Sequence, residues 1–190
     1  MRWWYAIKQS WLERENLKRF MTDPTKQIHS LTEVTAQRLD DANIAILVLD
    51  FDGVLGPHDA KEPLPEAMQW LKAITQIIGE SRVAILTNKP KPARLKFFSE
   101  HFPSIFIVQH VPKKPYPDGL LTIAEFKGIP PHRMVLIDDR LLTGMLATCL
   151  AYTQGWYFYP PKRNFWRNPV RETFFSLLRA FERTALRCIA

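Results

Sequence analysis

The sequence has little cysteine, little glycine and no long hydrophobic run, and each shortage argues against a class of protein. The 190 residues include two cysteines, Cys149 and Cys188, without metal-site spacing. A disulfide framework is therefore not expected. Instead, we expect both cysteines to be reduced thiols in a cytoplasmic protein. No stretch approaches the roughly 18–20 apolar residues that span a membrane. The N-terminus also lacks the apolar core and cleavage site of a signal peptide.

The histidines do not have the mutual spacing of metal ligands either. We interpret His58, His101, His110 and His132 as surface or loop residues. What is present is an ordinary share of hydrophobic residues, 46%, and of charged residues, 24%. This composition and length predict one globular domain with additional helices at its ends.

The positive charge is concentrated at the two ends of the chain. Of the net charge of +7, residues 1–21 carry +3 and residues 160–190 carry +5. Trp3, Trp4 and Trp11 lie among the N-terminal cations, and a basic amphipathic helix is predicted over 171–189. Each end could contact an anionic membrane or pack on the domain, and we leave both open.

These features divide the chain into three parts. We expect a basic aromatic helix over 1–22, a catalytic domain over 23–160 and a basic C-terminal helix within 161–190. Peripheral contact at the inner membrane face would involve residues 1–21 and 171–190. Nucleic acid is the weaker alternative partner for the basic ends.

The stretch Asn43–Leu55 is the centre of the predicted domain. Its apolar run is typical of a buried strand in a parallel sheet, yet it ends in Asp50 and Asp52. Carboxylates at the edge of a dry core are costly unless they are paired or bind a metal. The end of this strand is therefore the candidate active site.

Strands and helices alternate along the rest of the domain, which predicts an α/β fold with a mostly parallel sheet. Four further strands are expected, at Arg82–Leu86, Ser104–Val108, Met134–Ile137 and Gly155–Tyr159. Helices are expected at 3–20, 28–39, 67–78, 91–101, 119–126, 141–150 and 171–189.

Polar residues follow three of these strands and occupy one loop. They are Asp50 and Asp52, Thr87 and Asn88, Asp138 and Asp139, and the loop residue Lys114. In parallel sheets ligands bind at the carboxyl ends of the strands, so these groups should converge. Several carboxylates together suit Mg²⁺, and a lysine and a hydroxyl beside them suit a phosphoryl group.

The sequences of these segments resemble the haloacid dehalogenase (HAD) superfamily of phosphatases. Its four motifs appear in order as DFDGVL at 50–55, LTN at 86–88, KKPYP at 113–117 and IDDR at 137–140. The resemblance implies a Rossmann-like HAD fold with helices on both faces of the sheet. It also implies Mg²⁺ as cofactor and a phosphorylated substrate.

The resemblance assigns a role to each residue of the motifs. Asp50 is the nucleophile, and Asp52 is the general acid/base whose backbone carbonyl also reaches the metal. Thr87 and Asn88 bind the substrate phosphate, and Lys114 balances its charge. Asp139 completes the metal site, with Asp138 as a second acid.

A closer resemblance is to the YqeG-like, class IIIA branch, which includes phosphatidylglycerophosphate phosphatases. It rests on DPTKQI at 23–28, the DxDG strand and DDRLLTG at 138–144. Where that branch has a motif similar to GDQLLTD, Asp138 replaces the glycine and Gly144 replaces the last acid. This exchange leaves open a catalytically silent binding module that keeps the fold.

The lengths between the motifs leave no room for the lid, or cap, domain of many superfamily members. Only 53–64 and 89–113 are available for an insertion. An open site suits a large substrate, and a phospholipid headgroup such as that of phosphatidylglycerophosphate is the leading prediction. A nucleotide or a nucleic-acid end is the alternative.

Overall fold

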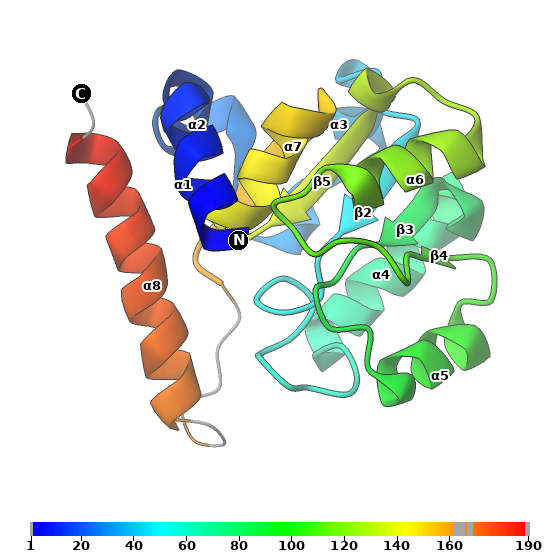
Figure 1. Ribbon diagram of the computed structural model, residues 1–190. Helices are drawn as coiled ribbons and strands as arrows, with labels where there is room; N and C mark the ends of the chain where they lie inside the picture. The colour runs from blue at the N-terminus through cyan, green and yellow to red at the C-terminus, as the bar shows by residue number, and fades with distance from the viewer. Residues whose placement is uncertain (1, 162–165, 167–168, 189–190) are drawn as a thin grey trace.

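The computed structural model describes residues 2–161, 166 and 169–188, and its centre is a parallel sheet (Figure 1). The strand order is β1-β6-β5-β2-β3-β4, and each neighbouring pair is parallel. The strands are β1 Gln27–Ile28, β2 Ile46–Leu49, β3 Val83–Ile85, β4 Phe106–Ile107, β5 Met134–Asp138 and β6 Gln154–Phe158.

Helices surround this sheet and extend beyond it at both ends of the chain (Figure 1). The α-helices are α1 Arg2–Leu12, α2 Arg14–Thr22, α3 Ala36–Asp41, α4 Pro65–Ile78, α5 Pro92–His101, α6 Asp118–Lys127, α7 Leu146–Ala151 and α8 Pro169–Cys188. Short 3₁₀ turns lie at Pro24–Lys26, Leu31–Glu33, Glu80–Arg82 and Pro131–Arg133, and a π-helical turn at Leu141–Met145.

The alternation of side chains along β2 gives the molecule a core on each face of the sheet. Leu47 and Leu49 pack with residues of α3, α4 and α5, whereas Ile46 and Val48 pack with residues of α6 and α7. Since all four strand positions are buried, β2 is apolar throughout. The predicted α/β architecture, with helices on both faces of a parallel sheet, is confirmed.

The order of the strands places a crossover beside β2. The chain runs outward from β2 to β3 and β4, then returns to β5 on the other side of β2. The carboxyl ends of β2 and β5 therefore form the point where the winding of the sheet reverses, which is where such sheets bind ligands.

One predicted helix, 28–39, is wrong. Ile28 belongs to β1, which pairs with β6 and adds a sixth strand to the five expected. The side chains of Ser30 and Thr35 then accept backbone N–H bonds and start two separate short elements, Leu31–Glu33 and α3. Two successive caps interrupt the segment, which periodicity alone did not reveal.

The N-terminal segment forms two helices rather than one, because α1 ends at Leu12 and α2 starts at Arg14. The predicted helix 141–150 begins instead as the π-helical turn and continues as α7. The C-terminal helix was expected to reach Ile189, which lies outside the described residues.

The expected absence of a cap domain is confirmed in the two fully described segments that could hold one. Residues 53–64 form turns, and residues 89–113 hold only α5 and β4 between their loops. Among the described helices, none has the length and apolarity to cross a membrane.

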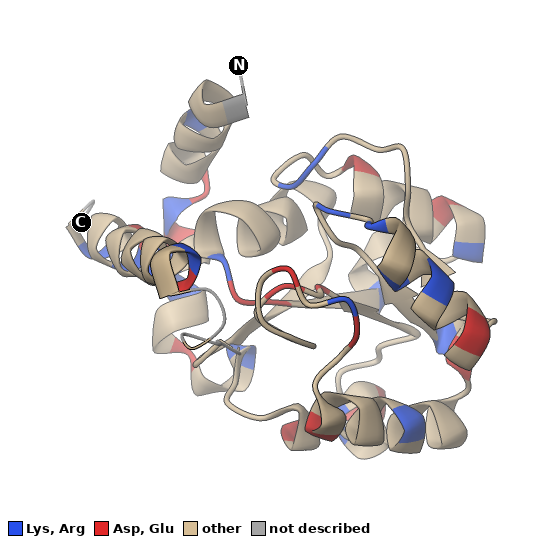
Figure 2. Cartoon of the chain, turned by 90° about the horizontal axis from the view of Figure 1, so that it is seen from below, with Lys and Arg blue, Asp and Glu red and all other residues tan. Residues whose placement is uncertain are grey.

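The terminal helix α8 packs on the domain with three of its charged side chains inward. Glu172, Arg179 and Glu182 are at most 2% exposed, whereas its apolar residues Phe174, Leu177 and Phe181 are 58–66% exposed. Near its end, Leu186 packs with Leu17 and Phe20 of α2. Figure 2, which views the molecule from below, shows α8 beside loops that carry acidic positions.

Candidate active site

Three buried carboxylates meet where β2 and β5 end. Asp50 follows β2, Asp138 is the last residue of β5, and Asp139 comes next. Each offers an oxygen atom, and the three oxygens lie within 4.8 Å of one another. Adjacent parallel strands in register cause this convergence, since Leu49 is paired with Ile137. Buried oxygen ligands at this spacing fit Mg²⁺, which prefers such donors.

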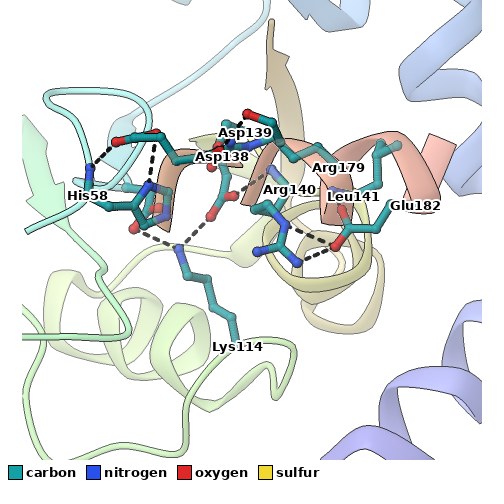
Figure 3. Close-up of polar contacts among 11 residues, drawn as sticks. His58, Lys114, Asp138, Asp139, Arg140, Leu141, Arg179 and Glu182 are labelled. Atoms are coloured by element: carbon teal, nitrogen blue, oxygen red, sulfur yellow. Dashed lines mark hydrogen bonds and ion pairs between the residues drawn. The ribbon is translucent and has the colours of Figure 1, made fainter. Parts of the chain in front are cut away.

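Lys114 lies between two of these acids (Figure 3). Its Nζ is 3.0 Å from Asp50 Oδ1 and 2.5 Å from Asp138 Oδ2, and the lysine itself is buried. Burial alone would lower the pKa of Lys114, but the two carboxylates outweigh it and raise this pKa. The lysine is therefore a fixed positive charge at the base of the site.

Burial raises the pKa values of two of the clustered acids, Asp50 and Asp139. Burial raises the pKa of Asp50 well above its ordinary value, and the charges of Asp138, Asp52 and Asp139 add to this against the effect of Lys114. Burial likewise raises the pKa of Asp139 to about 6, although a nearby arginine opposes it. A cation bound here would favour the ionised forms of both acids.

Asp52 is not one of the three clustered acids, and its side chain pairs with an arginine instead. Arg94 of α5 donates to its two oxygens at 2.6 and 3.1 Å, and Arg94 also stacks over the ring of Phe51. Burial would raise the pKa of Asp52, but the hydrogen bond and charge of Arg94 lower it. Asp52 is thus ionised at rest, and the sequence had not indicated its partner.

The second predicted motif holds the lysine loop in place. Asn88 was predicted to bind the substrate phosphate. Its Oδ1 accepts a 2.8 Å hydrogen bond from the backbone N–H of Lys114, so this side chain also holds the loop that carries the lysine. Thr87 is buried two residues after the end of β3, and its Oγ1 accepts a 3.2 Å bond from Lys89 N. Both residues lie at the predicted end of the sheet.

Two glycines make room for the acids. Gly53 has a φ of +92°, and a Cβ there would be 2.4 Å from Asp139 Oδ2. At Gly144 a Cβ would be 2.0 Å from Asp138 Cγ. Relative to the family motif, this chain has an acid at 138 in place of glycine and a glycine at 144 in place of an acid. The two changes belong together, because the side chain of Asp138 fits only where residue 144 has no side chain.

Asp138 also stabilises the turn that follows it. Its Oδ1 accepts a 2.9 Å bond from Arg140 N, while its Oδ2 contacts Lys114. Asp138 thus contributes to the three-acid cluster and also holds the backbone N–H of Arg140, just before the π-helical turn.

His58 lies in a loop, as one of the two predicted alternatives has it, but it is not on the surface. Its ring is buried and stacks on Phe175 of α8 at 3.8 Å between centroids, and its backbone N–H donates to Glu172. Burial lowers the pKa of His58 to about 3, so the ring is neutral. The loop 53–64 looked exposed because the sequence does not show that α8 covers it.

An open cleft of about 410 Å³ leads down to the acids. Polar side chains, among them Lys89 and Lys113, line its base, and apolar side chains of the two terminal helices form its rim. The apolar lining residues of these helices are Trp3, Ala6, Ile7, Phe174, Phe175, Leu178 and Phe181, and the π-helical turn adds Leu142. A second hollow of about 590 Å³, which includes Asp40, Arg82 and Lys127, contains none of the predicted site residues.

A family model of haloacid dehalogenase-like hydrolases matches residues 4–147, most of the chain, including the three acids, Asp52 and Lys114. The chain belongs to this family. Among curated proteins, it is similar to the probable phosphatase YqeG of Bacillus subtilis, with 25% identity over 130 residues. That match covers 68% of this chain and 72% of the relative. The predicted resemblance to the YqeG-like phosphatases of the superfamily is thereby confirmed.

The chain is also similar to solved structures. An uncharacterized protein of Corynebacterium glutamicum is 21% identical, with a TM-score of 0.48 over 67% of this chain and 91% of the other. A HAD family hydrolase of Deinococcus radiodurans, solved with bound phosphate and sodium, is 19% identical, with a TM-score of 0.39 over 60% and 80%. A further structure reaches a TM-score of 0.50 at 14% identity, over 77% and 84% of the two chains.

Proposed function

We propose that this HAD hydrolase is a Mg²⁺-dependent phosphatase that removes the terminal phosphate of a phospholipid headgroup, such as that of phosphatidylglycerophosphate. The shape of the cleft carries this proposal. Its base holds three acids and Lys114, and its rim is apolar and formed by α1 and α8. A substrate with a phosphate at one end and acyl chains at the other matches both parts.

Asp50 is the nucleophile in this proposal. Its carboxylate attacks phosphorus, a bond forms between Oδ and phosphorus, and the headgroup oxygen leaves with the bonding electrons. Lys114, fixed beside Asp50 at 3.0 Å, balances the charge of the phosphoryl oxygens. Mg²⁺ bound by Asp50, Asp138 and Asp139 would neutralise charge at the same oxygens, and the backbone carbonyl of Asp52 is a further proposed ligand.

Asp52 acts on the protons of the reaction. Because Arg94 keeps it ionised, it is ready to accept a proton from the water that hydrolyses the aspartyl-phosphate. To give a proton to the leaving oxygen in the first step, Asp52 must first gain one, which requires the Arg94 pair to loosen. The pair thus favours the base role over the acid role in the resting enzyme.

Exposed apolar side chains on the two terminal helices support a lipid substrate. The exposed apolar residues of these helices include Trp3, Trp4, Ile7, Trp11, Leu12, Phe174, Leu177 and Phe181. Four of them, Trp3, Ile7, Phe174 and Phe181, line the cleft. The segments that carry them have net charges of +3 and +5. Aromatic side chains with basic neighbours favour the interface of an anionic bilayer, so we place the enzyme peripherally on such a surface.

The test is phosphate release by wild-type protein and by Asp50→Asn, with Asp40→Asn at an exposed position of α3 as a matched control. With Mg²⁺, wild type and Asp40→Asn should hydrolyse an aryl phosphate, whereas Asp50→Asn should lose hydrolysis because the amide is a poor nucleophile. Retained hydrolysis in Asp50→Asn would exclude this nucleophile.

A substrate panel then separates the alternatives. Vesicles that contain a phospholipid with a terminal phosphomonoester should be the preferred substrate over a nucleotide and a 5′-phosphorylated oligonucleotide. Preference for either of the latter would favour a nucleotide or nucleic-acid-end phosphatase. No turnover, together with no Mg²⁺-dependent binding of beryllium fluoride, would identify a silent binding module.

A further inference from the structure

The helix α8 reaches the acid cluster from outside the segment that the family model matches. The match ends at residue 147, whereas α8 spans Pro169–Cys188. Three of its buried charged residues face the domain, and two of them contact residues 139–141 (Figure 3). A helix outside the matched segment therefore touches the proposed metal site.

Arg179 makes the most direct of these contacts. Its Nε and Nη2 lie 2.6 and 2.5 Å from the same atom, Asp139 Oδ2. Both side chains are buried, so neither charge can be satisfied by bulk water. Because both arginine nitrogens meet Oδ2, the second oxygen, Oδ1, is not used by this pair.

Other contacts fix α8 over this part of the chain. Glu182 Oε1 accepts a 2.9 Å bond from Arg140 Nε, and its Oε2 accepts a 3.1 Å bond from Leu141 N. Arg140 and Leu141 directly follow Asp139 in the sequence. The helix thus holds both the backbone after the acid and the acid itself.

We propose that Arg179 is a positioning residue that orients Asp139 through Oδ2 and leaves Oδ1 for the divalent cation. Groups that hydrogen-bond to a metal ligand set its orientation, and their loss typically weakens metal affinity about 10–100-fold. The inference rests on the proposed Mg²⁺ site. In this proposal α8 is a part of the active site, although it lies outside the segment that the family model matches.

The sign of the effect distinguishes positioning from simple charge. Arg179 is a cation beside a cation site, so its charge alone repels Mg²⁺, and neutralising it should tighten binding. If Arg179 orients Asp139, the same change should weaken binding, because the freed carboxylate no longer holds Oδ1 toward the cation.

The experiment is calorimetric titration of Mg²⁺ into the metal-free full-length protein. Arg179→Gln should bind Mg²⁺ at least about 10-fold more weakly than wild type, and Arg179→Lys should be intermediate because an ammonium cannot donate in the same paired geometry. Arg187→Gln, which removes the same charge from an exposed position of α8, should match wild type.

Each outcome decides one of the two proposals. If Arg179→Gln binds as tightly as wild type, or more tightly, the positioning role is excluded while the metal site stands. If the glutamine variant does not fold, wild-type affinity in Arg179→Lys excludes the role and intermediate affinity supports it. Absence of Mg²⁺ binding by wild type would overturn the proposed metal-dependent function itself.

Discussion

The helices α4 and α8 are both amphipathic, but α4 packs its apolar side against the protein, whereas α8 packs a side that carries charged residues. Helix α4 follows the usual rule: Ala67, Leu71 and Ile74 are buried against the sheet. Helix α8 has an equally regular apolar stripe but leaves much of it exposed and buries charged side chains instead. An apolar stripe therefore predicts a helix without showing what the stripe contacts.

The difference follows from what each helix covers. Helix α4 lies on the face of β2 and β3, where the strands present only apolar side chains. Helix α8 lies near the carboxyl ends of the strands, where Asp139 and Arg140 need charged partners. A buried charge is costly unless it has an ionic partner. The charged side of α8 therefore faces inward, where Arg179 and Glu182 pair with residues of the site.

The largest expected effect is the contrast between the same substitution on the two helices. Leu71→Ala removes a fully buried side chain of α4 and should lower the free energy of unfolding by about 2–5 kcal/mol. Leu177→Ala on the exposed stripe of α8 should change it by less than about 0.5 kcal/mol. Thermal denaturation measures both, and comparable losses would contradict the inverted packing of α8.

An intermediate effect is expected on the inward face of α8. Glu182→Gln leaves the half-buried Arg140 without its carboxylate partner and should destabilise the protein by about 1–3 kcal/mol. The control is Glu100→Gln, which removes an exposed ion pair with Lys96 that is worth less than about 1 kcal/mol. Denaturant unfolding compares the two variants, and equal losses would mean that α8 is held by other contacts.

The smallest effect on stability is expected where α8 is apolar and exposed. Phe181→Ser should leave the melting temperature unchanged but weaken partition onto anionic vesicles at least about 10-fold, because a large apolar side chain no longer enters the interface. Phe126→Ser removes an equally exposed phenylalanine from α6 as a control. Vesicle flotation measures the partition, and a similar loss in both variants would argue against α8 as the contact.

Much of the site could be predicted because its chemistry is local in the sequence. Asp50, Asp138 and Asp139 directly follow or end apolar strands, and parallel pairing brings such ends together. Lys114 was expected near them and contacts two of them. The partners of these acids could not be predicted, since Arg94 and Arg179 belong to helices whose inward faces depend on tertiary packing.

Other differences have the same origin. The buried position of His58 depends on α8, which is more than 100 residues away in the sequence. The strand β1 is two residues long and carries no periodic pattern, so only its pairing with β6 defines it. Such features are set by distant contacts rather than by local propensity.

By itself, the sequence determined the parallel α/β sheet, the acids at its carboxyl edge and the lack of room for a cap domain. Runs of apolar residues, their spacing and the polar residues at their ends are sufficient for these conclusions. Only the tertiary structure decided that α8 turns its charges toward the acids and its apolar stripe outward. The physical reason is that leaving a buried carboxylate without a cation costs more free energy than leaving an apolar helix face exposed to solvent. The sequence of α8 contains both a charged and an apolar face, so it does not show which one is buried.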